Sequence, residues 1–153
     1  MIIGEDGVRM EKEKVQKVIE WLVPRSMKDV QKFLGLANYY RQFVKDFARI
    51  AKPLHEITRK ETKWSWGEKQ QRAFEKLKER FMTEPVLVTP DLDKEMRVEA
   101  DASDFAMRGM LSMKCKDKKW RPVAYISKLL NEAERNYKIY DKEMLAIIWC
   151  LEV

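Results

Sequence analysis

The chain has 153 residues, of which 45% are hydrophobic and 37% are charged, a composition that fits a globular protein of one domain or two small modules. It has no run of about 18 apolar residues, so we expect no membrane-spanning helix and no membrane partner, and its start lacks the pattern of a secretory signal. The formal net charge of +6 is uneven: residues 1–83 hold 19 Lys and Arg against 12 Asp and Glu, whereas the remainder holds 12 against 13.

The basic excess in residues 1–83 favours two explanations about equally, a polyanionic partner such as nucleic acid and a solvated helical surface. The two cysteines, Cys115 and Cys150, lie far apart and form no CxxC motif. We therefore expect free thiols in a reducing compartment, which places the protein inside the cell, in the cytoplasm or the nucleus. His55 is the only histidine, which excludes any site that needs two.

The N-terminal part begins with signals for a hairpin and a helix. The stretch GEDGV (4–8) carries an Asp-Gly turn signal between short apolar pairs, which makes a small hairpin possible. Residues 11–22 place apolar side chains at helical spacing, and Pro24 stops that helix. Ser26 then fits the N-cap of a second helix, with Asp29 three residues on as a weak capping box.

The segment after Ser26 is strongly helical in period. Gly35 is predicted to break or bend it, and Pro53 to limit a later helix. The clearest amphipathic helix covers 62–82, with Phe74, Leu77 and Phe81 as its apolar stripe. Four aromatic residues are interpreted as helix-packing core rather than base-stacking platforms: Tyr39, Tyr40, Phe43 and Phe47. Trp64 and Trp66 are interpreted as packing residues at the module junction.

After Pro90 the hydrophobic period changes from helix to strand. Strands are predicted at 96–101, in AMRGMLSMKC and in WRPVAYIS, with CKDKKW as the turn between the last two. NEAERNY and YDKEMLAIIWCLEV read as helix, and residues 144–151 are apolar nearly all round, so this helix is predicted to be buried. The chain thus divides near residue 84 into a basic helical module and an α/β module.

Two carboxylates of the second module suggest chemistry. In strand 96–101 the side chain of Asp101 lies on the face opposite Ala100, where the strand ends; the pattern alone favours a polar strand end over a functional group. Glu143 lies at the start of the last helix, aligned with an apolar stripe; a favourable interaction with the helix N-terminus is the simpler explanation, and a metal ligand the alternative. Converging carboxylates of this kind can hold Mg²⁺, which prefers oxygen ligands.

The sequence resembles the reverse transcriptase–ribonuclease H region of the polyprotein of gypsy-type long-terminal-repeat retrotransposons. Similarity to the end of the polymerase palm and to the thumb/connection helices is seen in IIGEDGV and in EKVQKVIEWLVPRSMKDVQKFLGLANYYRQFVKDFARIAKPLHEITRK. The stretch WSWGEKQQRAFEKLKERFMTEPVL resembles a bridging helix and the start of the ribonuclease H module. Similarity to the first three strands and the first helix of that module is seen in VEADASDFAMRGMLS, WRPVAYISKLLNEAERNY and YDKEMLAIIWCLE.

This resemblance implies an α+β fold: residues 1–83 form the palm end, thumb and connection helices, and residues 84–153 form an incomplete RNase H-like module of three antiparallel strands and a helix. Asp101 matches the family's first catalytic aspartate and Glu143 the glutamate of its first helix, so both are the predicted catalytic and metal-binding residues. The implied cofactor of the intact enzyme is Mg²⁺. The implied partners are an RNA–DNA hybrid or other nucleic acid, and the remainder of the polyprotein.

The chain departs from the family pattern in ways that affect activity. Arg108 stands where the family usually has glycine, and we expect it to crowd the turn between the first two strands or to change their twist. The family's third metal-binding aspartate, on a later strand, and the polymerase aspartates lie outside this sequence. In the family fold the first strand is paired on both sides, and one of those neighbours is missing here, so the strand of Asp101 is expected at an open sheet edge. We therefore expect a fragment with little or no polymerase or nuclease activity. The alternative is a non-catalytic remnant of a transposable element that binds nucleic acid or protein.

Overall fold

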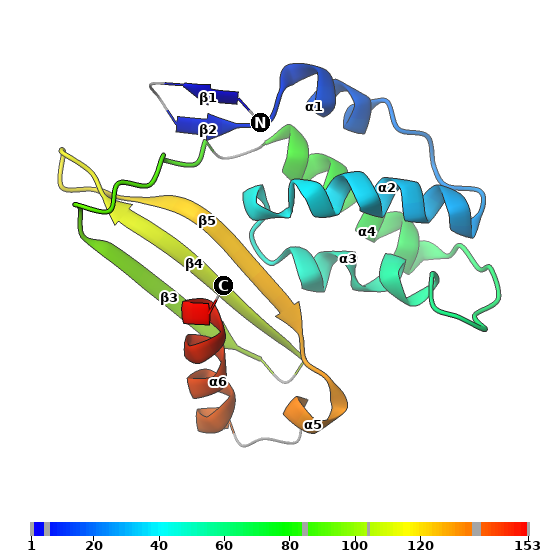
Figure 1. The fold of residues 1–153 in the computed structure, drawn as a ribbon. Coiled ribbons are helices and arrows are strands. Elements are labelled where there is room, and N and C mark those ends of the chain that lie inside the picture. The colour runs from blue at the N-terminus through cyan, green and yellow to red at the C-terminus, as the bar shows by residue number, and fades with distance from the viewer. Residues whose placement is uncertain (1, 5–6, 84–85, 104, 136–138, 153) are drawn as a thin grey trace.

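A computed structural model describes residues 2–4, 7–83, 86–103, 105–135 and 139–152; for 2–4, 139–143 and 152 it describes the backbone only. Helices and a three-stranded sheet lie side by side, as Figure 1 shows, so the predicted α+β class is confirmed. In chain order the elements are β1 (Ile2–Gly4), β2 (Gly7–Arg9), α1 (Lys12–Ile19), α2 (Met27–Tyr39), η1 (Arg41–Phe43), α3 (Phe47–Glu56), α4 (Glu68–Met82), β3 (Met96–Ala102), β4 (Ala106–Lys114), β5 (Trp120–Leu129), α5 (Glu132–Arg135) and α6 (Ile139–Glu152). None of the helices in these ranges is both long and apolar enough to cross a membrane.

The predicted N-terminal hairpin is present. Strands β1 and β2 pair antiparallel, and beyond α4 the chain returns to β2, where the N–H of Leu87 donates to the carbonyl of Val8 at 2.9 Å. Gly7 has φ +127°, and a Cβ at this position would collide with the carbonyl oxygen of Leu87. Glycine is therefore required here both by the backbone conformation and by the close approach of the two segments.

Two predictions about helix breaks were wrong, and one about a cap was confirmed. The N–H of Asp29 donates to the Ser26 hydroxyl at 3.3 Å, as expected of an N-cap. Helix α2 runs through Gly35 without interruption, and α3 contains Pro53 in its interior. Both helices bury a face in the common core, with Phe33 and Leu54 almost completely covered, and this burial outweighs the local cost of Gly and Pro.

The main hydrophobic core lies among the N-terminal helices. Helix α4 buries the predicted stripe of Phe74, Leu77 and Phe81, although it begins at Glu68 rather than at residue 62. Of the six aromatic residues predicted to pack, Tyr40, Phe43 and Phe47 are buried and Trp66 contacts Phe74 edge-on; Tyr39 and Trp64 are exposed, Tyr39 to 64%. The prediction of helix-packing core is thus confirmed for Tyr40, Phe43 and Phe47 and wrong for Tyr39. Trp64 stacks on Trp66 with 5.9 Å between the ring centroids, so both tryptophans pack.

The sheet has the order β3–β4–β5, and its neighbouring strands are antiparallel, as predicted. Strand β3 pairs with β4 alone among the described residues, so it is an edge strand, as expected. Helix α6 packs on one face, where Ala146 and Trp149 belong to the same hydrophobic cluster as Ala102 of β3. On the other face β5 meets η1 and α3, so the sheet lies between α6 and the helical module (Figure 1).

Helix α6 is less buried than its composition predicts. Ala146 is fully buried, but several of its large apolar side chains are exposed: Met144, Ile147, Ile148 and Leu151. The expectation of an all-round buried helix was wrong, because α6 contacts the described residues mainly on its sheet side. The approach there is close, since a Cβ at Gly109 of β4 would collide with the sulfur of Cys150.

Candidate functional site

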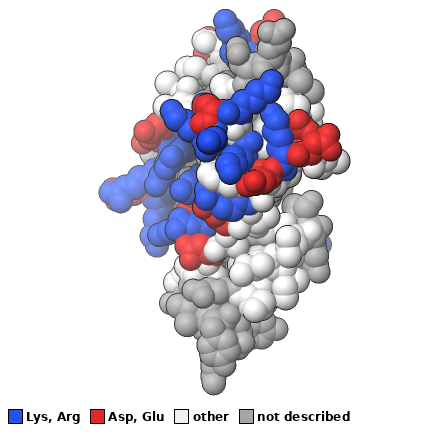
Figure 2. Space-filling model, turned by 90° about the vertical axis from the view of Figure 1, so that its left-hand side faces the viewer, with Lys and Arg blue, Asp and Glu red and all other residues white. Residues whose placement is uncertain are grey.

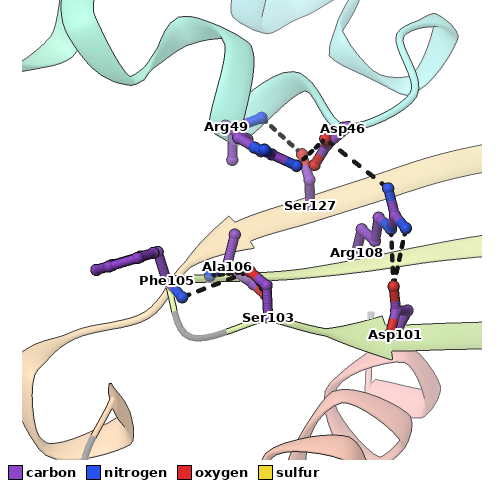
Figure 3. Close-up of polar contacts among 9 residues, drawn as sticks. Asp46, Arg49, Asp101, Ser103, Phe105, Ala106, Arg108 and Ser127 are labelled. Carbon is purple, nitrogen blue, oxygen red and sulfur yellow. Dashed lines mark hydrogen bonds and ion pairs between the residues drawn. The ribbon is translucent and has the colours of Figure 1, made fainter.

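Asp101 lies near the end of β3, directly opposite Arg108 of β4. The Arg108 guanidinium donates from Nη2 to Oδ2 of Asp101 at 2.8 Å and from Nε to the same oxygen at 3.2 Å (Figure 3). Residues paired across a ladder project on the same face of the sheet, which brings these two side chains together. Arg108 therefore forms a cross-strand ion pair, and the expected crowding of the turn or change of twist stays a prediction.

Arg108 also faces Asp46, which precedes α3. Its Nη1 lies 4.0 Å from Oδ2 of Asp46, and the same oxygen lies 3.8 Å from Nη1 of Arg49 (Figure 3). Asp46 adopts a left-handed backbone conformation, with φ 62°, which an aspartate tolerates better than most residues. The cation of Arg108 thus stands between a carboxylate of the sheet and a carboxylate of the helical module.

A cavity of about 180 Å³ opens beside this ion pair, between β3, β4, β5 and the segment before α3. Its lining includes Lys45, Asp46, Asp101, Arg108 and Tyr125. Burial raises the pKa of Tyr125, so its hydroxyl stays protonated at neutral pH. The cavity walls therefore carry both signs of charge together with an uncharged phenol.

Of the two predicted catalytic residues, the structure describes the side chain of Asp101 only. On β3, Ala100 and Ala102 pack toward α6, so Asp101 between them projects to the opposite face, toward Arg108. Glu143 lies on α6, but its side chain is outside the described residues, as is all of Asp104. The pairing of Asp101 with Glu143 stays a prediction. Glu99, predicted to be a surface residue, is exposed and pairs with Arg97 at 3.1 Å.

At the predicted magnesium site, the structure describes one of the two predicted ligands, Asp101. Mg²⁺ needs several oxygen ligands in near-octahedral arrangement. Asp101 offers a carboxylate, but Arg108 already neutralises it, and no group of three or more His, Cys, Asp or Glu side chains that could hold a metal ion occurs in the described part of the chain. In this arrangement the carboxylate serves the contact between strands.

Sequence reasoning missed the residues that join the sheet to the helical module. The buried hydroxyl of Ser127 on β5 accepts a hydrogen bond from the N–H of Ala48 at 2.8 Å, in the first turn of α3. Arg41 donates from Nη2 to the carbonyl of Ser127 at 2.6 Å and lies over the ring of Phe47. Nothing in the local pattern marks Ser127, because its partner is 79 residues away.

The comparisons with known proteins agree with this architecture. Residues 66–153 match the model of the RNase H-like domain found in reverse transcriptase, and the chain belongs to this family. Over 150 residues it is 38% identical to the Transposon Tf2-3 and Tf2-4 polyproteins of Schizosaccharomyces pombe, which covers 98% of this chain and 11% of each polyprotein. The chain thus spans about a tenth of the length of these relatives.

Two solved structures of a foamy viral protease-reverse transcriptase have the same fold. A foamy viral protease-reverse transcriptase in complex with RNA/DNA hybrid matches with a TM-score of 0.82 and 25% identity, over 97% of this chain and 20% of that one. A second structure of that enzyme, dRH in complex with ds DNA, matches with a TM-score of 0.84 and 24% identity, over 97% of this chain and 26% of that one. Both helices and sheet of the present chain therefore follow an arrangement seen in a reverse transcriptase.

Proposed function

We propose that this chain is the segment of a gypsy-type retrotransposon polyprotein that links the reverse transcriptase to its ribonuclease H, with thumb/connection helices in residues 1–83 and the first half of the RNase H-like domain in residues 84–153. The intact polyprotein copies RNA into DNA and hydrolyses the RNA of the hybrid. Within it, this segment binds nucleic-acid duplex. The observation that carries the proposal is the likeness of 97% of the chain to a reverse transcriptase complexed with RNA/DNA hybrid.

In the intact polyprotein we assign Asp101 and Glu143 the role of magnesium ligands. This role requires Asp101 to leave Arg108, because a carboxylate oxygen that accepts two guanidinium hydrogen bonds is poorly available to a metal ion. The chain by itself is therefore expected to bind hybrid without cleaving it. The engagement of Asp101 by Arg108 also supports the second candidate, a non-catalytic remnant that binds nucleic acid or protein.

The experiment is a paired binding and cleavage assay on a labelled RNA–DNA hybrid with Mg²⁺, using the chain and its Asp101→Asn variant. We expect salt-dependent binding by both proteins and no cleavage by either. Absence of binding contradicts the proposed function. Cleavage by the chain that the Asp101→Asn variant lacks contradicts the expected inactivity and establishes the catalytic role of Asp101.

A further inference from the structure

The turn between β4 and β5 carries a concentration of positive charge that the proposed function does not use. Residues 114–121, KCKDKKWR, hold five Lys and Arg and a single acid, Asp117. The second module is close to neutral, with 12 Lys and Arg against 13 Asp and Glu over residues 84–153, so this charge is local rather than general. We call Lys116, Lys118 and Lys119 the tip lysines.

The side chains of the tip lysines are accessible to an external anion. All three are exposed, and no ion pair joins their side chains to any described residue. The acid among them is already neutralised, because Arg121 donates from Nη1 and Nη2 to the two oxygens of Asp117 at 2.9 and 2.6 Å. The hydrogen bonds from Arg121, then the one from the Lys119 N–H, and then the charges of Arg121 and Lys119 lower the pKa of Asp117, so it stays ionised and paired with Arg121. The attraction that Asp117 exerts on the tip lysines is thereby reduced.

The backbone of the turn holds one tip lysine at a conformational cost. The N–H of Lys118 donates to the carbonyl of Cys115 at 2.9 Å, and that of Cys115 donates to the carbonyl of Lys119 at 2.9 Å, which closes a three-residue loop. Lys118 has φ 64°, a left-handed conformation that glycine adopts freely and that costs a residue with a Cβ about 1 kcal/mol. A lysine at position 118 therefore lowers the stability of the fold relative to glycine, and it places a positive charge at the end of the turn.

The chemistry of the tip suits phosphate groups rather than bases. Lysine is a compact point charge on a flexible stem, and three of them without a guanidinium fork suit phosphate oxygens at varied positions. The neighbouring aromatic ring, Trp120, is covered by the Arg97 guanidinium, whose Cζ lies 4.5 Å from the ring centroid, so this ring face is not available for base stacking. The turn lies at the end of the sheet away from α5, and Figure 2 shows Lys and Arg gathered on that side of the molecule.

We propose that the tip lysines bind the phosphate backbone of a nucleic-acid duplex without sequence preference. This inference rests on the proposed function, because it takes the duplex as the ligand, and it locates a contact that the excess charge of residues 1–83 does not indicate. Each backbone contact releases condensed counterions, so it appears in the dependence of affinity on salt. Loss of the tip lysines should reduce the slope of log K against log salt by about 2 to 3 and the affinity about tenfold or more at low salt.

The test compares two triple variants of equal net charge. The tip variant carries Lys116→Gln, Lys118→Gly and Lys119→Gln. The control carries Lys28→Gln, Lys32→Gln and Lys63→Gln, three exposed lysines of the helical module that form no ion pair with a described residue. Binding of a short mixed-sequence RNA–DNA hybrid is measured between about 50 and 200 mM salt. Thermal unfolding is followed in parallel, where glycine at position 118 should maintain or raise the melting temperature.

Weaker binding and a smaller salt slope in the tip variant, with the control close to the unmodified chain, support the proposal. Equal losses in both variants overturn it, because binding then follows net charge. A tip variant that binds as well as the unmodified chain also overturns it and leaves the proposed function intact. If the unmodified chain does not bind the hybrid at all, the proposed function and this inference both fail.

Discussion

Arg108 and Asp101 face each other across the β3–β4 ladder and form two hydrogen bonds, of 2.8 and 3.2 Å. Their side chains are 44% and 57% exposed, so solvent screens the attraction. A double-mutant cycle of Arg108→Gln and Asp101→Asn should give a coupling of about 0.2–1 kcal/mol in the free energy of unfolding, measured by urea denaturation. A coupling well above this range would mean that the pair is more shielded from water than the structure shows.

Release of Asp101 should make it available to divalent cations. In Arg108→Gln the Asp101 carboxylate loses its cationic partner, and we expect tighter Mn²⁺ binding, seen as stronger paramagnetic broadening of the Asp101 amide signal. Arg108→Lys serves as the control because it retains the positive charge. If Glu143 shares the ion, adding Glu143→Gln to Arg108→Gln should reverse the gain. Unchanged broadening in Arg108→Gln would count against a metal role for Asp101.

Ser127 should contribute more to stability than a buried serine without a partner. Its hydroxyl accepts the N–H of Ala48, so Ser127→Ala leaves that buried donor unpaired and should cost about 1–3 kcal/mol in the free energy of unfolding. The matched control is Ser112→Ala on β4, because the buried Ser112 hydroxyl has no hydrogen-bond partner within the part of the chain that the structure describes. That substitution should be neutral or stabilising. Similar losses of unfolding free energy at both positions would show that the Ser127 hydrogen bond does not add to the stability of the protein.

His55 should make the protein less stable in mild acid. Burial, followed by the charges of Arg41 and Arg59, lowers its pKa in the folded protein below the ordinary value of 6.5. As the pH falls below about 6.5, the unfolded chain takes up the proton first, so stability is lost until the pH reaches the lower folded pKa. Chemical denaturation at several pH values should show this loss, and His55→Gln, which cannot titrate, should show a smaller one. Equal pH dependence in both proteins would contradict the shift.

The candidate site was only partly accessible to sequence reasoning. Alternation along 96–101 correctly placed Asp101 on the face opposite Ala100, because strand periodicity is a local property of the backbone. The partner of Asp101 was not foreseen, since the choice of Arg108 depends on the register between two strands. The charge of residues 114–121 was visible in the sequence, but the conformation of Lys118 and the pairing of Asp117 were not.

What the sequence determined by itself is the set of local periodicities, the Ser26 cap and the family resemblance, because each is encoded within a few neighbouring residues or in a long ordered pattern. The tertiary structure alone decided that Gly35 and Pro53 lie within continuous helices, since burial of the opposite helix face outweighs their local preference. It also decided that Arg108 stands between Asp101 and Asp46. That contact exists only because separate elements pack at one sheet face, and no local pattern encodes such packing.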